Sequence, residues 1–213
     1  MTVTRWWWIR HAPVTETNGR IYGATDPNAT IESPEAYRAL DAMLPDDAVW
    51  VTSHLKRTKQ TAAAIAKAGG RQIAPLEEPD LGEQSFGAWH GLTYDEVNAF
   101  ADSHRFWLAP ATHRPPDGES FADLTIRVSR VIHRLTDENA GRDIIAVAHG
   151  GSIRAALGVA LELTPEDALK FATENLSLTR LDHHAASGGH PPTWCVTWMN
   201  RPPAGDLILG QPA

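Results

Sequence analysis

Two histidines of the sequence each follow an apolar run of the kind that forms a buried strand. A run of three tryptophans and an isoleucine stops at Arg10 and His11, and the run 143–148 stops at His149 and Gly150. In open α/β sheets, ligands bind at the carboxyl ends of the strands. If the two strands are parallel neighbours, we expect the two imidazoles to lie side by side at that edge.

A second guanidinium and a carboxyl group occupy positions that could bring them to the same edge. Arg57 lies where a predicted strand, 48–53, runs into a predicted helix, 58–68, and the first N–H groups of a helix attract anions. Glu83 lies in a loop rich in glycine and aromatic residues, next to Gly82. Each residue alone is ordinary on a protein surface. Their significance therefore depends on whether they meet.

Such a set of side chains suits a phosphoryl group. Two guanidiniums and two imidazoles would form a cationic pocket that matches its negative oxygens. A neutral imidazole is also a good nucleophile, and a carboxyl group can protonate a leaving alcohol. We therefore predict that Arg10, His11, Arg57, Glu83 and His149 surround a single tetrahedral anion.

The elements that must position these residues alternate between strands and helices, as in an α/β domain. Further strands are predicted over 71–76, 177–182 and 193–200, and helices over 33–43, 92–100, 120–138, 153–163 and 165–172. The last two strands would form a hairpin. Residues 14–30 are predicted to be a loop, and residues 101–116 an irregular cover over the site.

Composition limits the kind of protein this chain can be. Its 213 residues fit one α/β domain, and its formal net charge of −7 argues against a nucleic-acid binder or a ligand of anionic membranes. No apolar run approaches the roughly 20 residues of a membrane span, and no signal peptide is recognised. Cys195 is the single cysteine, so no internal disulfide is expected and the cytoplasm is the expected compartment.

Three histidines in the loop of the predicted hairpin suggest a metal site. His183, His184 and His190 are close in sequence. The loop holds no cysteine or carboxylate at ligand spacing, which structural and catalytic metal sites commonly use. We therefore predict no metal site there.

Five short motifs follow one another along the chain. They are Arg10-His11, Ser53-x-Leu55-x-Arg57-x-x-Gln60-Thr61-Ala62, Glu83 with Phe86-Gly87-x-Trp89-x-Gly91, Gly118-Glu119-Ser120, and His149-Gly150-Gly151. In this order they resemble the histidine phosphatase superfamily, in its phosphoglycerate-mutase-like branch. Any one motif is weak, but five in order, spanning residues 9 to about 181, are specific.

The resemblance implies a role for each of the five side chains. His11 would be the nucleophile that becomes a phosphohistidine, while Arg10, Arg57 and His149 would hold the phosphoryl oxygens. Glu83 would protonate the leaving oxygen and then activate the water that hydrolyses the intermediate. Members of this family use no metal ion or organic cofactor, so none is expected here.

The resemblance also implies the architecture. We expect a phosphoglycerate-mutase-like α/β fold with three layers, in which helices flank a mixed, mostly parallel sheet. A single histidine-phosphatase-like domain would occupy residues 1–213. Residues 77–118 would form a cap or loop region over the site.

Two positions depart from the family pattern. Ala12 stands where the family usually has a glycine, so a backbone that relied on the freedom of glycine would be altered here. The family often has an asparagine six positions after the nucleophilic histidine, where this chain has Thr17 followed by Asn18. We expect Thr17 or Asn18, together with Gly150, to contact the phosphate.

Three functions stay open at this stage. The favoured one is a phosphatase that hydrolyses a small phosphorylated metabolite. A mutase of the same family would return the phosphoryl group to a bound product, but mutases tend to carry longer insertions between the acid and the second histidine. A catalytically silent binder of phosphorylated ligands would have no need of Glu83. The expected partner is a small phosphomonoester, not nucleic acid or a membrane, and a homodimer stays open.

Overall fold

A six-stranded sheet forms the centre of the molecule. The computed structural model describes residues 2–100 and 103–203. Strand order is β3-β2-β4-β1-β5-β6; the first four strands are parallel, and β5 and β6 are antiparallel to their neighbours. The predicted mixed, mostly parallel sheet is confirmed. The strands are β1 (Val3–Arg10), β2 (Val49–Thr52), β3 (Leu76–Glu77), β4 (Asp143–Ala148), β5 (Leu178–His184) and β6 (Thr193–Arg201).

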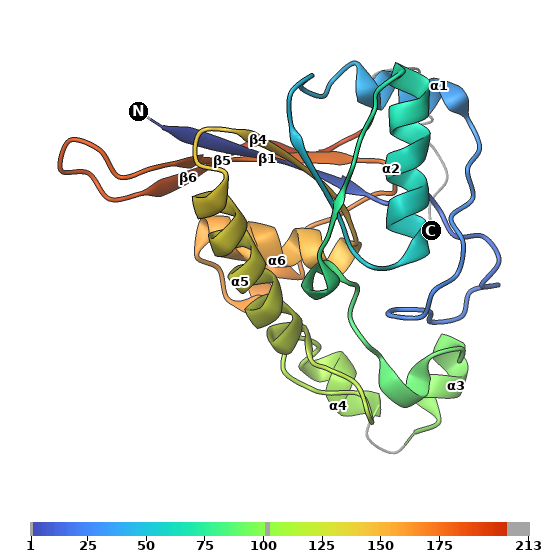
Figure 1. The fold of residues 1–213 in the computed structure, drawn as a ribbon. Helices are drawn as coiled ribbons and strands as arrows, with labels where there is room; N and C mark the ends of the chain where they lie inside the picture. The colour runs from blue at the N-terminus through green and yellow to red at the C-terminus, as the bar shows by residue number, and fades with distance from the viewer. Residues whose placement is uncertain (1, 101–102, 204–213) are drawn as a thin grey trace.

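Helices cover both faces of the sheet, which gives the three predicted layers. The helices α1 and α2 pack on one face, and α5 and α6 pack on the other (Figure 1). None of the described helices combines the length and hydrophobicity needed to cross a membrane. The helices are α1 (Pro34–Asp41), α2 (Lys56–Gly69), α3 (Tyr94–Asn98), α4 (Ser103–Leu108), α5 (Phe121–Glu138), α6 (Gly150–Leu161) and α7 (Pro165–Ala168), with 3₁₀ turns η1 (Pro79–Leu81) and η2 (Gly87–Trp89).

The tryptophans of β1 join the two apolar cores. Because successive side chains of a strand point to opposite faces, Trp6 and Trp8 lie on the α5–α6 side and Trp7 lies on the α1–α2 side. The rings of Trp6 and Trp8 stack with their centroids 4.9 Å apart. The indole N–H of Trp6 donates to Thr136 Oγ1 at 2.9 Å, so this buried polar group is satisfied.

Parallel pairing of β1 with β4 sets the position of the two histidines. Arg10 is the register partner of Ala148, the last residue of β4. His11 and His149 directly follow these two residues and therefore leave the sheet at the same edge. The two strands are therefore parallel neighbours, which is the condition on which the expected approach of the two imidazoles depends.

The predicted strand over residues 71–76 is wrong for most of its length. Of these residues only Leu76 belongs to β3. The Arg71 side chain turns back to the Asp41 carboxylate and donates to the carbonyl of Pro45 at 2.6 Å, which fixes the chain beside α1. Pro75 also lacks an N–H for a strand ladder.

Residues 101–116 are more regular than predicted. They contain the helix α4, and residues 101 and 102 lie outside the described residues. Phe106 of α4 is buried with Trp89 and Val97 in a small third core, away from the sheet (Figure 1). Amphipathic spacing is hard to detect in so short a helix. That residues 77–118 act as a cap, and that residues 1–213 form one domain, stay predictions.

Several predicted helices differ from the structure at their ends. The helix α6 starts at Gly150, directly after β4, three residues earlier than expected, and α2 starts at Lys56, so that Arg57 lies in its first turn. The helix α3 is shorter than 92–100, but its predicted capping box at Thr93 and Glu96 is present. Gly150 and Gly151 obscure the start of α6 in the sequence because glycine has a low intrinsic helix propensity.

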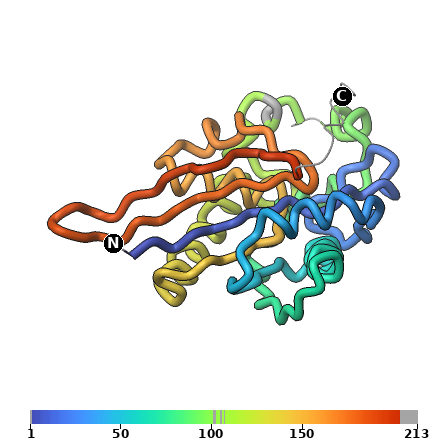
Figure 2. Tube along the Cα trace, turned by 90° about the horizontal axis from the view of Figure 1, so that it is seen from above, coloured from blue at the N-terminus to red at the C-terminus, as the bar shows by residue number. Residues whose placement is uncertain are grey.

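The predicted C-terminal hairpin is present as β5 and β6. Its tip extends past the rest of the chain on the side of the N-terminus (Figure 2). The His183 ring packs against Trp194, with ring centroids 4.7 Å apart. Across residues 2–100 and 103–203, no group of three or more His, Cys, Asp or Glu side chains gathers closely enough to hold a metal ion.

Candidate active site

His11 is held at the end of β1 by bonds to its backbone. Its N–H donates to the carbonyl of Ala148 at 3.0 Å, and Nδ2 of Asn175 donates to its carbonyl at 2.7 Å. The residue is 1% exposed. Asn175 lies in the connection to β5 and was not predicted as a site residue, since loop positions carry little pattern.

The ring of His11 is fixed in one tautomer. Its Nδ1 lies 2.7 Å from the carbonyl oxygen of Ala12, and because a carbonyl can only accept, Nδ1 carries the hydrogen. Nε2 therefore has a free electron pair, toward which Arg57 Nε donates at 3.3 Å. Burial and then the positive charge of Arg57 lower the pKa of His11 to about 3. The imidazole is neutral at physiological pH and its Nε2 is available for attack.

Ala12 causes no strain at the position where the family usually has glycine. Its backbone is not left-handed, so the freedom of glycine is not required. Its N–H donates to Thr61 Oγ1 at 2.9 Å, and its methyl group is fully buried in the core on the α1–α2 side. The expected disturbance of the backbone after His11 is absent.

His149 faces His11 across the edge of the sheet. The two ring centroids are 5.1 Å apart and the rings are inclined at 60°. Nε2 of His149 is hydrogen-bonded to Ser53 Oγ at 2.8 Å, while its buried Nδ1 has no hydrogen-bond partner in the described part of the chain. Burial, with His11 and Arg57 nearby, lowers the pKa of His149 well below its usual value. Ser53 belongs to the quoted motif, but sequence reasoning did not assign it this contact.

The two arginines are anchored by backbone carbonyls. Arg57 is fully buried, and its Nη1 and Nη2 donate to the carbonyls of Thr25 and Gly23 at 2.7 and 2.6 Å. Arg10 Nη1 donates to the carbonyl of Thr173 at 2.5 Å, and its Nε is buried without a partner. Because no carboxylate among the described residues forms an ion pair with either guanidinium, their positive charge is available to an anion.

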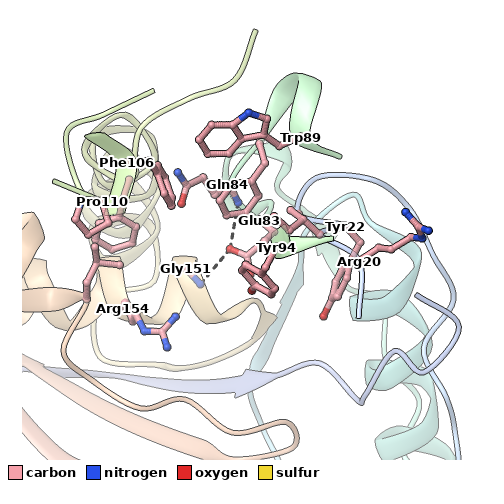
Figure 3. Close-up of a pocket in the computed structure, with 15 residues that line it drawn as sticks. Arg20, Tyr22, Glu83, Gln84, Trp89, Tyr94, Phe106, Pro110, Gly151 and Arg154 are labelled. Carbon is pink, nitrogen blue, oxygen red and sulfur yellow. Dashed lines mark hydrogen bonds between the residues drawn. The ribbon is translucent and has the colours of Figure 1, made fainter. Parts of the chain in front are cut away.

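Glu83 lies against the start of α6. Its Oε1 accepts two backbone hydrogen bonds, from the N–H of Gly151 at 3.0 Å and from the N–H of Gln84 at 3.1 Å (Figure 3). Arg127 fixes the loop from behind: it donates to the carbonyl of Glu83 at 3.2 Å and forms an ion pair with Glu119 at 2.6 Å. Glu119 belongs to the quoted Gly-Glu-Ser motif. Its partner Arg127 was missed because it lies in the middle of an amphipathic helix.

A cavity of about 320 Å³ opens beside Glu83. Its lining includes Glu83 and Gly151, which lies two residues after His149, but neither of the two imidazoles. Six of its fifteen lining residues are aromatic, and one arginine lies at each side (Figure 3). The lining residues that carry this character are Arg20, Tyr22, Phe86, Trp89, Tyr94, Phe106, Phe121 and Arg154.

Thr17 and Asn18 lie in a turn of the loop that follows β1. The carbonyl of Thr17 accepts the N–H of Arg20 at 2.9 Å, and Asn18 is exposed with a left-handed backbone. The residues of this loop that line the described cavity are instead Arg20 to Gly23. Contact of Thr17 or Asn18 with a phosphate stays a prediction.

The structure thus brings five predicted side chains together at one edge of the sheet: Arg10, His11, Arg57, Glu83 and His149. A family model of the histidine phosphatase superfamily (branch 1) matches residues 6–190. The chain belongs to the histidine phosphatase superfamily. The catalytic roles of these five side chains stay proposals for this chain.

The curated relatives of this chain are named for different activities. It is 29% identical over 185 residues to the 2,3-bisphosphoglycerate-dependent phosphoglycerate mutase 2 of Gloeobacter violaceus, covering 83% of this chain and 84% of that protein. It is 34% identical over 151 residues to the glucosyl-3-phosphoglycerate phosphatase of Mycolicibacterium vanbaalenii, covering 66% of each. A bifunctional protein of Mycobacterium tuberculosis is 36% identical over 113 residues, which span 53% of this chain and only 30% of that protein.

Solved structures agree on the fold. The mycobacterial glucosyl-3-phosphoglycerate phosphatase superposes with a TM-score of 0.80 at 25% identity, covering 93% of this chain and 99% of that one. The alpha-ribazole phosphatase of Shigella flexneri superposes with a TM-score of 0.77 at 22% identity, covering 95% and 100%. The predicted phosphoglycerate-mutase-like architecture is confirmed.

Proposed function

We propose that this histidine phosphatase is a phosphomonoesterase that acts through a phosphohistidine on His11. The observation that carries the proposal is the state of His11: a neutral imidazole whose Nε2 electron pair lies beside the Arg57 guanidinium. Near it, the buried Nδ1 of His149 has no hydrogen-bond partner among residues 2–100 and 103–203. A nucleophile and the groups that would hold a phosphoryl oxygen are thus in place before substrate binds.

In the first step, His11 Nε2 attacks phosphorus. The phosphoryl oxygens lie between Arg10, Arg57 and His149, and the N–H of Gly150 at the start of α6 is a further donor toward them. An N–P bond forms while the ester O–P bond breaks, and Glu83 gives its proton to the leaving alkoxide. The products of this step are phosphohistidine, an alcohol and the Glu83 carboxylate.

In the second step, water replaces the alcohol. The Glu83 carboxylate takes a proton from a water molecule, whose oxygen attacks phosphorus as the N–P bond breaks. Inorganic phosphate leaves, and His11 and Glu83 return to their starting protonation states. Residues of this chain and the attacking water supply every proton and electron pair of the two steps, so the proposed reaction includes no step that calls for a metal ion or organic cofactor.

The aromatic cavity beside Glu83 would take the leaving group. It adjoins the carboxyl that protonates the leaving oxygen, so the alcohol portion of the substrate must extend into it. Its volume of about 320 Å³ suits a small metabolite rather than a macromolecule. The phosphatases named among the relatives support hydrolysis of such a compound.

A phosphoglycerate-mutase reaction is the second candidate, because a relative with that name aligns over most of this chain. The two reactions share the phosphohistidine and differ in what removes the phosphoryl group. Between Glu83 and α5, the described residues form the 3₁₀ turn η2 and the short helices α3 and α4 and no longer element. That small interval favours hydrolysis over a mutase that must retain its product.

Rapid acid-quench labelling tests the proposal. With ³²P-labelled 3-phosphoglycerate as donor and EDTA present, we expect an acid-labile, base-stable phosphoprotein that is absent from the His11→Ala variant. Chasing the label with water alone should release inorganic phosphate, and adding unlabelled 2-phosphoglycerate should not divert it. Wild-type protein that turns over substrate without any label would rule out His11 as the nucleophile, and transfer to the added acceptor would identify a mutase.

A further inference from the structure

Three neighbouring strands of the sheet end in polar side chains that stand in a row. The strands β2, β4 and β1 are consecutive and parallel, and Thr52 of β2 is the register partner of Val147 of β4. The residues that follow these strands, Ser53, His149 and His11, therefore leave the sheet side by side. The two histidines take part in the proposed reaction, but Ser53 has no role in it.

Ser53 is the partner of one of the two ring nitrogens of His149. Its Oγ lies 2.8 Å from Nε2, and both side chains are fully buried, so solvent does not compete for this contact. The other ring nitrogen, Nδ1, is also buried and has no hydrogen-bond partner among the described residues 2–100 and 103–203. Because buried polar groups are normally paired, Nδ1 is the atom through which His149 would hold a phosphoryl oxygen.

The position of the hydrogen on the His149 ring follows from this contact with phosphate. A phosphoryl oxygen accepts hydrogen bonds, so Nδ1 has to carry a hydrogen. Burial, with His11 and Arg57 nearby, lowers the pKa of His149 well below its usual value, so its ring is neutral and carries a single hydrogen. With that hydrogen on Nδ1, Nε2 has a free electron pair, and the Ser53 hydroxyl has to donate to it.

The neighbours of Ser53 leave its hydrogen available for this bond. Thr58 Oγ1 lies 3.1 Å from Ser53 Oγ, a longer contact than the 2.8 Å to His149. The hydroxyl of Thr58 donates its own hydrogen to the carbonyl of Leu55 at 2.8 Å, and the N–H of Leu55 donates to Ser53 Oγ at 3.2 Å. The hydroxyl oxygen of Ser53 therefore already accepts one bond, and the nearest acceptor for its single hydrogen is Nε2 of His149.

We propose that Ser53 is a positioning residue that fixes His149 in the tautomer with its hydrogen on Nδ1, so that the neutral ring donates to a phosphoryl oxygen. This inference rests on the proposed function and adds to it a residue that touches neither the substrate nor the nucleophile. In the opposite arrangement, Ser53 would donate to Thr58 and accept from Nε2 of His149. The bare Nδ1 would then face the phosphoryl oxygens and repel them.

The two imidazoles of the site are thus fixed by opposite means. The carbonyl of Ala12 accepts from Nδ1 of His11 and leaves Nε2 bare, which suits a nucleophile. The hydroxyl of Ser53 donates to Nε2 of His149 and leaves the hydrogen on Nδ1, which suits the binding of an anion. Two neutral rings in the same tautomer therefore present an electron pair and a hydrogen to one phosphoryl group.

Nitrogen NMR of the wild-type protein, labelled with ¹⁵N-histidine and saturated with inorganic phosphate, tests the tautomer directly. The His149→Gln spectrum identifies the signals of this ring. We expect the shift of a protonated nitrogen at Nδ1 and that of a bare nitrogen at Nε2. In Ser53→Ala, which has no donor for Nε2, the hydrogen should move in part to Nε2. Thr58→Val removes the neighbouring hydroxyl and is the matched control, so both shifts should stay unchanged.

Steady-state kinetics provide a second readout. His149 would act on the phosphoryl group and not on the leaving group, so Ser53→Ala should lower kcat/KM about tenfold for alkyl phosphates and for p-nitrophenyl phosphate alike. Loss of an acid, in contrast, depends on the leaving group. Ser53→Thr keeps the hydroxyl and should restore most of the activity, and Thr58→Val should stay within about twofold of the wild type.

Three results would overturn the inference. The first is a phosphate-bound wild-type protein in which Nε2 of His149 carries a hydrogen, alone or together with Nδ1. The second is a Ser53→Ala protein with unchanged shifts. The third is a Thr58→Val protein that changes them as much, which would direct the Ser53 hydrogen to Thr58. If Ser53→Ala does not fold, the wild-type and Thr58→Val spectra decide. The expected tautomer in a protein that forms no phosphohistidine would support the inference while contradicting the proposed nucleophile.

Discussion

At the scale of single residues, the two arginines of the site are held by backbone carbonyls and not by carboxylates, so their positive charge is not neutralised. Arg57 is fixed by the carbonyls of Gly23 and Thr25 rather than by a carboxylate. A carbonyl dipole holds the side chain in place but leaves its net charge intact. That charge helps to keep His11 neutral in the free protein, and it is available to a phosphoryl group when substrate binds.

Glu83→Gln tests the acid at this scale. The amide keeps the shape of the side chain and can still accept the N–H of Gly151, but it cannot give up a proton. We expect kcat/KM for alkyl phosphates to fall about 100-fold or more, and that for p-nitrophenyl phosphate to fall less than about tenfold, because nitrophenolate leaves without protonation. Steady-state kinetics on the two substrates measure the difference. Equal losses on both would remove Glu83 from the acid role.

The residues that could be predicted are those carried by short motifs. His11, Arg57 and His149 stand at strand or helix ends, where a single apolar run fixes their position. Their supporting partners could not be found in this way. Asn175 and Thr173 come from a connection whose path depends on how α7 and β5 pack, and nothing local in the sequence encodes that packing.

At the scale of elements, the start of α6 organises the carboxyl side of the site. The helix begins immediately after β4, so its first N–H groups point at the edge where both imidazoles lie. Gly151 allows the carboxyl of Glu83 to approach this backbone closely. A Cβ there would lie 2.3 Å from Glu83 Oε1, a distance that no real Cβ tolerates.

Gly151→Ala tests this close approach. The methyl group would push the Glu83 carboxyl away from the helix while the rest of the fold adjusts, because the clash is with the end of a flexible side chain. We expect kcat/KM for alkyl phosphates to fall about tenfold or more, with a change in unfolding free energy below about 1 kcal/mol. Gly158→Ala, on the same helix but away from the site, is the control. Full activity in Gly151→Ala would show that the contact is dispensable.

Element types were predictable where apolar spacing was long and regular. The buried stripe of α5 and the runs of β1 and β4 meet that condition. The element predictions are wrong where contacts between distant side chains outweigh the local sequence pattern. Arg71 leaves the strand direction to reach Asp41, and the short helix α4 exists because Phe106 packs on Trp89.

At the scale of the whole molecule, two neutral imidazoles buried in the fold affect its stability in acid. The pKa of His11 is about 3 in the folded chain against a usual value of 6.5, and that of His149 is also lowered. At pH values between about 3 and 6.5, the unfolded chain binds a proton at His11 that the folded chain does not bind. Stability therefore falls as the pH falls through this range.

Chemical denaturation at different pH values measures this effect. For His11 alone, we expect a loss of about 2 kcal/mol in the free energy of unfolding between pH 7 and about pH 5. The His11→Gln variant should lose correspondingly less stability over the same interval. His190→Gln, which changes an exposed residue of the hairpin, should behave like the wild type. An identical pH dependence in His11→Gln and wild type would contradict the prediction.

The order of strands could not be derived from periodicity, which reports the faces of a strand and not its neighbours. Parallel pairing of the two histidine strands was predictable because the proposed chemistry required it. The position of β5 on the other side of β1 was not predicted and comes from the structure alone.

That order has a consequence for biosynthesis. The strand β1 is translated before both of its neighbours, β4 and β5, which begin at Asp143 or later. At about 5–20 residues per second, its tryptophans remain without their final partners for on the order of ten seconds. The nascent chain therefore carries an unshielded apolar segment until β4 and β5 have been translated.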